Sequence, residues 1–378
     1  MSQFGDIGVT EAQLDLLTAA ERFCREQSPM SSVRALIETD LGYDADVWAE
    51  IGALGWLAIA VPEDFGGVGL SMTEVVPVME QMGRYMLHSP FFATTLAAQA
   101  IVMGGTQAQK ETHLAAIAGG AAATVALSEA GGNWDLTAIS STALMTDSGY
   151  RLSGEKTFVQ DLEAARTIII SAKVDGAVQL FCLDADTIPA KAIRRERIID
   201  DIKRSYALTL DGLVVPDTAL MDGGKVTQTL EHIHLVANLL GAAEMTGAAQ
   251  ATIDYTVDYL KTRKQFGKLI GSFQALKHPT VDAYIDYEKS RSLLYAAAFS
   301  FGDQWPQNDK RSEIATRMAK AQSDKALSYA ADRSIQFHGG FGFTYDCDAQ
   351  LYRRRAIFNA SQYGDAHYHK KKLAQLIL

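Results

Sequence analysis

The segment RKQFGKLIGSFQALKH, residues 263–278, combines an arginine, an aromatic ring and a glutamine around a glycine turn. A guanidinium can form two parallel hydrogen bonds with a pyrophosphate, and an aromatic ring can lie against a flat heterocycle. The segment also lies between two long stretches whose apolar residues have helical spacing. It therefore predicts a turn between two helices that contacts a phosphate-bearing cofactor.

The bulk properties of the chain restrict its class. A length of 378 residues exceeds the size at which one hydrophobic core keeps growing, so two or three packed units are expected. The net charge of -10 gives no basic surface for nucleic acid or anionic lipid, and no apolar run approaches 18 residues. The first residues do not form a basic segment followed by an apolar run, so we expect no secretory leader and a cytoplasmic protein.

No metal site is expected, because the cysteines and histidines lack ligand spacing. The three cysteines, Cys24, Cys182 and Cys347, are scattered along the chain. This distribution also argues against a disulfide framework and favours a reducing compartment.

The texture of the sequence changes twice. Residues 1–120 show helical spacing broken by Gly/Pro clusters such as VPEDFGGVGL at 61–70. Residues 121–220 contain short β-rich runs separated by Gly and Asp, which predict a small antiparallel barrel or sandwich. Residues 221–378 return to helical spacing and predict a four-helix bundle. The predicted fold class is α+β, with the three segments as successive domains.

Several motifs occur in a fixed order along the chain. They are VPEDFGGVGLS (61–71), MEQMGRYMLHSP (79–90), LSEAGGNWD (127–135), GYRLSGEKTFV (149–159), SYALTLDGLVVPDTALM (205–221), DYLKTRKQFGKLIGSFQALKH (258–278) and QFHGGFGFT (336–344). Each is weak alone, but together they resemble the acyl-CoA dehydrogenase family over essentially the whole chain. The YGDAHYH ending (363–369) and the DYLKTRKQFG segment resemble the small subunit of pimeloyl-CoA dehydrogenase and the partner subunits of bacterial steroid side-chain dehydrogenases.

The resemblance implies FAD as cofactor, bound across a subunit interface. Arg263 and Gln274 match residues that reach the adenosine and pyrophosphate of a neighbouring subunit's FAD, and Phe266 matches a residue that packs beside them. Taken alone, Arg263 is better explained by a surface ion pair with an acid such as Asp258 or Asp282.

Three further residues, Gln336, Gly339 and Gly340, match the loop over which the same diphosphate passes. Glycine lacks a Cβ atom, so backbone N–H groups can approach phosphate closely. An ordinary helix end is the alternative explanation for the two glycines.

The β-rich region departs from the family pattern at the flavin ring. Ser128 matches a cofactor-binding position of the family, but Trp134 stands where a small serine is usual. Phe158 and Gln160 replace a tryptophan and a threonine that lie against the ring in the family. The resemblance therefore implies a modified flavin pocket in this chain.

The usual catalytic carboxylate is missing. Family enzymes carry the glutamate at positions that correspond here to Tyr363 or Ala237, and neither side chain can act as a carboxylate base. Glu244, Asp365 and Asp346 are weak substitutes, and Asp346 is better explained as a loop-capping residue. A polar helix-packing contact is the alternative for Glu244, and a helix N-cap is the alternative for Asp365.

These expectations give one main function and two alternatives. The main function is α,β-dehydrogenation of an acyl-CoA, with this chain as the subunit of a heteromeric enzyme that supplies FAD contacts but lacks the glutamate. The alternatives are a self-sufficient homotetramer with a displaced carboxylate, and a non-catalytic structural subunit. By resemblance, the partners are an acyl-CoA from fatty acid or steroid degradation, a related subunit or a second copy, and an electron-transfer flavoprotein.

Overall fold

The computed structural model describes residues 10–303 and 310–378. The first nine residues, where no secretory leader is expected, lie outside the described residues. The chain forms two compact units. The helical unit comprises the chain up to Arg34, then Met72–Leu87 and Asn238–Leu378, and the mixed unit comprises Ala35–Ser71 and His88–Ala237. The division into segments 1–120, 121–220 and 221–378 stays a prediction.

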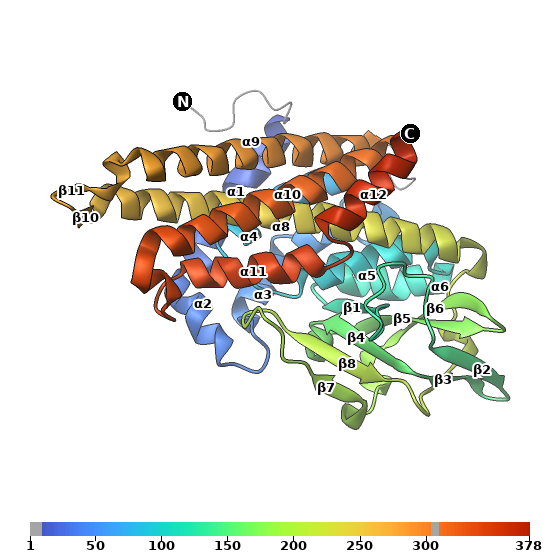
Figure 1. Cartoon of the computed structure of the whole chain (residues 1–378). Helices are drawn as coiled ribbons and strands as arrows, with labels where there is room; N and C mark the ends of the chain where they lie inside the picture. The colour runs from blue at the N-terminus through green and yellow to red at the C-terminus, as the bar shows by residue number, and fades with distance from the viewer. Residues whose placement is uncertain (1–9, 304–309) are drawn as a thin grey trace. The chain divides into compact units, whose positions relative to one another are not determined.

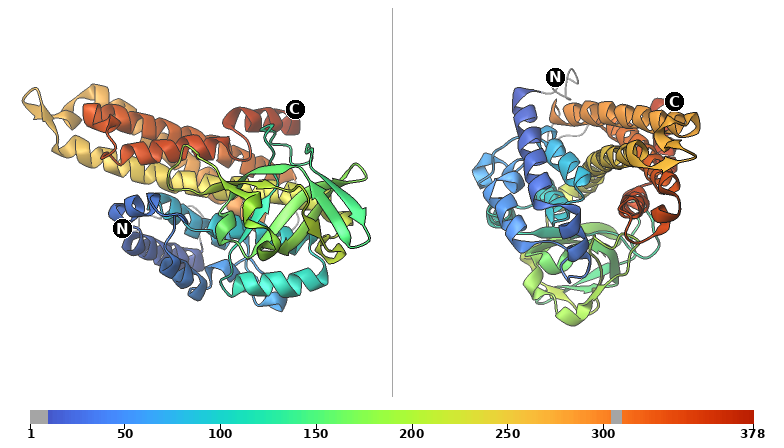
Figure 2. Two further views of the ribbon diagram at one scale, coloured as in Figure 1. Left: turned by 90° about the horizontal axis from the view of Figure 1, so that it is seen from below. Right: turned by 90° about the vertical axis from the view of Figure 1, so that its left-hand side faces the viewer.

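The helical unit is built from long helices that run side by side (Figures 1 and 2). It contains, wholly or in part, α1 (Glu11–Gln27), α2 (Met30–Ile37), α4 (Met72–Arg84), α8 (Val226–Thr262), α9 (Gln274–Asp303), α10 (Lys310–His338), α11 (Ala349–Ser361) and α12 (Ala366–Ile377). The helical spacing expected before the RKQFG turn corresponds to one helix of 37 residues, α8. The predicted C-terminal helical bundle is also confirmed.

Polar caps at helix starts explain several boundaries. The Thr10 hydroxyl accepts a hydrogen bond from the backbone N–H of Gln13, whose side chain in turn accepts from Thr10 N–H, and α1 begins at the next residue. Asp44 caps α3 in the same manner by accepting from two backbone N–H groups. Such caps satisfy donors that have no partner inside the helix.

The mixed unit contains shorter helices and most of the strands. Its helices are α3 (Ala45–Ala53), α5 (Phe91–Gly104), α6 (Gln107–Gln109) and α7 (Ala115–Ala118). Its strands are β1 (Ala123–Ala126), β2 (Thr142–Thr146), β3 (Gly149–Ser153), β4 (Glu155–Gln160), β5 (Thr167–Val174), β6 (Ala177–Asp184), β7 (Ile193–Arg195), β8 (Ser205–Thr209) and β9 (Val214–Val215). The predicted order of helices, strands and helices is confirmed.

The strands form two sheets around one apolar core. The larger sheet has the order β1-β5-β2-β3-β9 with β6 on β5, and the smaller has the order β4-β8-β7. Tyr150 and Phe181 meet edge to face in the core at 5.3 Å between ring centroids. Two pairings differ from the antiparallel expectation: β1 and β2 both run parallel to β5. The long connection between β1 and β5, which contains the β2–β3 hairpin, makes their parallel arrangement possible.

Two glycines allow α4 and α8 to touch through their backbones. A Cβ atom on Gly247 would lie 1.8 Å from the Glu80 carbonyl oxygen, and one on Gly83 would lie 2.1 Å from the Glu244 carbonyl oxygen. No side chain fits at such distances. The crossing therefore requires glycine on both helices.

We expect Gly247→Ala to destabilise the protein by about 3 kcal/mol or more, because the added methyl overlaps a backbone that cannot move away as a side chain can. Gly241→Ala is the matched control on the same helix, since its Cβ would have only Lys320 Cε nearby, at 3.9 Å. That change should leave stability unchanged or raise it by up to ~1 kcal/mol. Urea unfolding of both variants measures the difference, and equal stabilities would contradict the close crossing.

Candidate functional site

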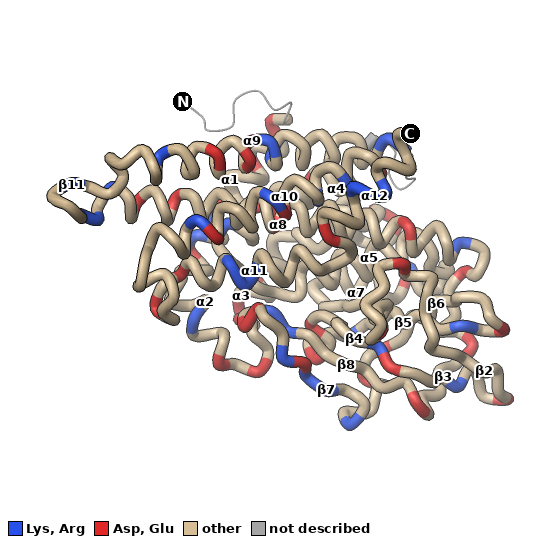
Figure 3. Tube along the Cα trace, viewed as in Figure 1, with Lys and Arg blue, Asp and Glu red and all other residues tan. Residues whose placement is uncertain are grey.

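A cationic hairpin closes one end of the helical bundle. It consists of β10 (Lys264–Gln265) and β11 (Lys268–Leu269), between the end of α8 and the start of α9. Arg263 stands at its base, where its N–H donates to the Tyr259 carbonyl oxygen at 2.9 Å. Basic residues gather at this tip of the helical unit (Figure 3). Arg263 is exposed and makes no ion pair within the described residues, so the alternative pairing with a nearby acid is not formed.

Phe266 lies at the tip of this hairpin and points into solvent. Its ring is 92% exposed, and its backbone has a positive φ of 53°. Its only ring neighbour among the described residues is Phe273, edge to face at 6.3 Å between centroids. An aromatic side chain in this conformation is uncommon, so the hairpin holds a strained residue that displays an unpacked ring.

The C-terminal end of α10 lies at the same end of the bundle (Figure 1). His338, the last residue of α10, stacks on Tyr259 with 4.1 Å between ring centroids. Gln336, Gly339 and Gly340 are all exposed beside it. The structure thus brings together, at one end of the bundle, most of the residues predicted to contact the cofactor. This bundle-end group consists of Arg263, Phe266, Gln274, Gln336, Gly339 and Gly340.

The glycines of the following turn, η10 (Gly339–Phe343), differ in what they pack against. A Cβ atom on Gly342 would lie 2.2 Å from the Ile335 carbonyl oxygen, so internal packing explains this glycine. Gly339 has a φ of +61°, which glycine adopts without strain. Neither internal packing nor a positive φ explains the glycine at position 340, and its Cβ would meet nothing within 4 Å. The space above Gly340 is open to a molecule from outside the chain.

Ser128 belongs to the mixed unit and is not part of this group. Its loop is fixed by Glu129, which accepts hydrogen bonds from Lys156 Nζ at 2.8 Å and from the Ser141 hydroxyl at 2.7 Å. Burial disfavours the ionised form of Glu129, but these hydrogen bonds outweigh it and lower the pKa of the carboxyl. The loop that carries Ser128 is therefore held by a charged contact to β4.

The end of β4 carries a second strained aromatic residue. Phe158 has a φ of 54° next to a register shift in the strand, and its side chain is 44% exposed. Its N–H donates to Glu196 Oε2 at 3.0 Å, and the same oxygen accepts from the Ser205 hydroxyl at 2.8 Å. Glu196 thus stabilises the conformation that turns the ring outward.

Glu244, a candidate base, is buried among three helices. Arg355 Nη1 donates to its Oε1 at 2.6 Å, and Asn359 Nδ2 donates to its Oε2 at 3.0 Å. Lys320 Nζ donates to the Asn359 carbonyl oxygen at 2.7 Å, and burial lowers the pKa of this amine to about 8. Glu244 therefore links α8 to α11 in the way expected for a helix-packing contact, and its role as a base stays a prediction.

Asp365, the other candidate, is the N-cap of α12. Its Oδ1 accepts a hydrogen bond from Tyr368 N–H at 2.7 Å. The N-cap expected as the alternative role of this residue is thus formed. Like Glu244, Asp365 has a structural function that is independent of catalysis.

One of the two positions at which a base is expected, Tyr363, contacts the residue that follows the other in the sequence. Asn238, which follows Ala237 on α8, donates from Nδ2 to the Tyr363 carbonyl oxygen at 3.2 Å. Tyr363 has a φ of 55°, and burial raises the pKa of its phenol above the ordinary value. A neutral phenol and a methyl group occupy these positions, so neither supplies a carboxylate.

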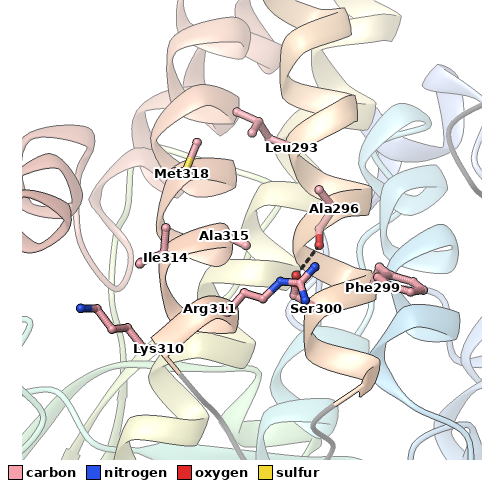
Figure 4. Close-up of a pocket in the computed structure, with 9 residues that line it drawn as sticks. All are labelled: Leu293, Ala296, Phe299, Ser300, Lys310, Arg311, Ile314, Ala315 and Met318. Atoms are coloured by element: carbon pink, nitrogen blue, oxygen red, sulfur yellow. Dashed lines mark hydrogen bonds between the residues drawn. The ribbon is translucent and has the colours of Figure 1, made fainter. Parts of the chain in front are cut away.

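A separate cavity of about 700 Å³ opens between α9 and α10 (Figure 4). It is lined by Leu293, Ala296, Phe299, Ser300, Lys310, Arg311, Ile314, Ala315 and Met318. These residues belong to the last part of α9 and the first part of α10. The cavity therefore lies at the end of these helices away from the hairpin and is not part of the group described above.

Two features are absent from the part of the chain that the structure describes. No group of three or more His, Cys, Asp or Glu side chains there could hold a metal ion. No helix in residues 10–303 and 310–378 is both long and apolar enough to cross a membrane.

Comparison with known families identifies the fold. The acyl-CoA dehydrogenase N-terminal domain matches residues 10–121, and the acyl-CoA dehydrogenase C-terminal domain matches residues 236–377. The chain belongs to the acyl-CoA dehydrogenase family. Acyl-CoA dehydrogenase IpdE2 of Mycolicibacterium smegmatis is 28% identical over 365 residues, which cover 96% of this chain and 97% of the relative.

Solved structures with the same fold agree with this assignment. The steroid ACAD Tcur3481-Tcur3483 is 28% identical with a TM-score of 0.85, covering 97% of this chain and 98% of that chain. The ChsE4-ChsE5 complex from Mycobacterium tuberculosis is 24% identical with a TM-score of 0.86, covering 98% of both chains, and shows the same fold.

FAD is the cofactor of this family, and one part of the chain fits it well. The bundle end offers an exposed guanidinium, an exposed aromatic ring and open backbone at Gly340, which suit a dinucleotide. Sequence reasoning missed the Tyr259–His338 stack beneath these groups. The only signals for it were a tyrosine one turn before Arg263 and a histidine directly before the two glycines.

Glu244→Gln should lower stability by about 3 kcal/mol, because it leaves the buried Arg355 without a countercharge. Asp365→Asn should change stability by less than ~0.5 kcal/mol, because asparagine caps helices as well as aspartate does. If both carboxylates are structural only, turnover per folded enzyme is unchanged in each variant. A 100-fold loss of turnover in Asp365→Asn at unchanged thermal stability would instead identify this residue as the base.

Proposed function

We propose that this chain is one subunit of a heteromeric acyl-CoA dehydrogenase and that it contributes contacts to FAD bound mainly by a catalytic partner subunit. The observation that carries this proposal is the outward orientation of the bundle-end group. Arg263, Phe266 and Gly340 contact little of their own chain, and the chain's internal packing does not explain a glycine at position 340.

The absent base supports the same assignment. Removal of the α-proton of an acyl-CoA requires a carboxylate near the substrate, while FAD accepts the hydride from the β-carbon. This chain presents Tyr363 and Ala237 at the two expected positions, and Glu244 is engaged by Arg355 and Asn359. A partner with an intact glutamate would supply the proton acceptor.

The relatives are consistent with a two-chain enzyme. The ChsE4-ChsE5 structure is of a complex, and Tcur3481-Tcur3483 is a steroid ACAD. By analogy, the substrate of the assembly is an acyl-CoA from steroid or fatty acid degradation, and the assembly is a heterotetramer reoxidised by an electron-transfer flavoprotein. Within it, Arg263 would bind the pyrophosphate, Phe266 would pack beside the adenosine, and Gln274 and Gln336 would donate hydrogen bonds.

The alternative of a self-sufficient homotetramer requires a displaced carboxylate in this chain. The hydrogen bonds to Glu244 and the capping role of Asp365 both disfavour it. Trp134 and Phe158 also place large rings in the region where family members hold the flavin ring.

The chain purified alone should contain little flavin and show no dehydrogenation, because its FAD contacts serve another subunit. Co-expression with a related subunit that retains the glutamate should yield a preparation with the visible absorbance of oxidised FAD. The measurement is an absorbance spectrum of each preparation with protein quantified in parallel. Stoichiometric FAD and turnover in the lone chain would disprove the heteromeric assignment.

Gly340→Ala should weaken FAD binding by the assembled enzyme about tenfold, equivalent to ~1.4 kcal/mol, because a methyl fills the space open to the cofactor. The thermal stability of the lone chain should not change. Gly342→Ala is the matched control and should destabilise the lone chain, since its Cβ overlaps the Ile335 carbonyl. If neither Gly340→Ala nor Arg263→Ala lowers the flavin content of the assembly, the chain is a structural subunit without a cofactor role.

A further inference from the structure

The bundle-end group has two parts, the hairpin side with Arg263 and the turn with Gly339 and Gly340. The buried side chain of His338 connects these two parts. His338 is the last residue of α10 and only 3% exposed. Its ring stacks on Tyr259 at 4.1 Å with 26° between planes, and on Tyr255 at 4.8 Å with 16° between planes. Both tyrosines belong to the last turns of α8, which leads into the hairpin.

The orientation of the imidazole is fixed by a hydrogen bond. Its Nδ1 lies 2.7 Å from the Ser334 carbonyl oxygen, which can only accept, so Nδ1 carries the proton. The Ser334 hydroxyl in turn accepts from Thr256 Oγ1 at 2.8 Å. Two neighbouring contacts thus hold the end of α10 against the end of α8, one aromatic and one polar.

Both parts of the bundle-end group lie within a few residues of the stacked His338 and Tyr259 rings. Arg263 lies one turn beyond Tyr259 and donates its N–H to the Tyr259 carbonyl oxygen. Gly339 directly follows His338. The side chains of the bundle-end group are exposed and do not hold one another. The distance between the hairpin and the glycine turn therefore depends on the stacked rings of His338, Tyr255 and Tyr259.

The other end of the glycine turn is anchored independently. Arg34 donates to Asp348 Oδ1 at 2.6 Å and to the Tyr345 carbonyl oxygen at 2.8 Å, and its guanidinium lies over the Tyr345 ring. The turn between His338 and Asp348 is therefore fixed at both ends. Tyr255 of α8 also reaches the far end, because its hydroxyl lies 3.6 Å from Cys347 Sγ, but His338 is the contact that directly adjoins the Gly339–Gly340 pair.

We propose that His338 is a positioning residue that sets the spacing between Arg263 and the Gly339–Gly340 turn, so that one dinucleotide can contact both. The FAD part of this inference rests on the proposed function, whereas the spacing itself is a property of the chain alone. A ligand that spans two elements binds best when their separation is preset, because no binding energy is then lost in ordering them.

The side-chain chemistry explains why several replacements would differ. Phenylalanine keeps a flat ring for stacking but loses the Nδ1–H bond to Ser334. Leucine keeps most of the volume but has no planar face. The positioning role therefore predicts that phenylalanine restores most of the wild-type spacing and leucine does not.

The test measures the spacing directly in the lone chain. Nitroxide labels are placed by Lys268→Cys on the hairpin and Phe343→Cys on the turn, both at exposed positions, while Cys24, Cys182 and Cys347 are buried. Pulsed electron paramagnetic resonance then gives the distribution of label distances. We expect one narrow distribution in the labelled parent, at least a twofold broader one with His338→Leu, and a near-parental one with His338→Phe.

A buried histidine near the C-terminus provides the matched control. His369 contacts Arg317 and Tyr368 in the same helical unit and is not part of the stack with Tyr255 and Tyr259. His369→Leu should therefore lower thermal stability without broadening the distribution of label distances. An unchanged width in His338→Leu, or equal broadening in His369→Leu, would overturn the positioning role.

A second readout separates this inference from the proposed function. In the assembled enzyme, the FAD dissociation constant should rise at least tenfold with His338→Leu and less than twofold with His338→Phe. Broadening of the label distances with unchanged FAD affinity would support the spacing role and refute the proposed contact with FAD. Unchanged distances with weakened FAD binding would refute the spacing role and leave the FAD contact standing.

Discussion

The contact of the α4 and α8 backbones at Gly83 and Gly247 is the constraint on which the helical unit depends. Helices that carry side chains at a crossing stay ~8–10 Å apart, whereas glycines permit a closer approach. Because α8 is 37 residues long and lies against α4 here, the crossing fixes the direction of the whole helix. The positions of Glu244 and Tyr259 on α8, and of Arg263 directly after it, therefore depend on this contact.

Buried charges complete the alignment of the helices that follow. Arg355 and Glu244 lie deep in the unit, where desolvation costs much of what their attraction contributes. Their value is geometric, because a paired charge tolerates only one register between α8 and α11. Lys320 adds a third helix through the Asn359 carbonyl. Glu244, Arg355, Asn359 and Lys320 thus form one rigid framework that connects α8, α10 and α11.

Part of this architecture could be predicted from sequence because it depends on local patterns. Helical periodicity and the RKQFG turn predicted α8, the hairpin and α9, and the order of motifs predicted the family. The parallel pairing of β1 with β5 could not be predicted, since it depends on which distant strands meet rather than on local propensity. The carboxylates were ambiguous for the same reason. A glutamate and an aspartate are chemically competent bases until the donors around them are known, and here Arg355, Asn359 and the Tyr368 N–H occupy them. Likewise, the sequence shows Gly340 and Gly342 as equivalent, and only their surroundings distinguish packing from openness.

The outward exposure of the bundle-end residues has a thermodynamic consequence. A ligand held by groups from two chains is linked to their association, so each increases the apparent affinity of the other by the same factor. In the proposed assembly, the cofactor would therefore stabilise the association of the two subunits as well as accept electrons. The amount of intact enzyme in a cell would then follow the supply of flavin, through a chain that performs none of the redox chemistry itself.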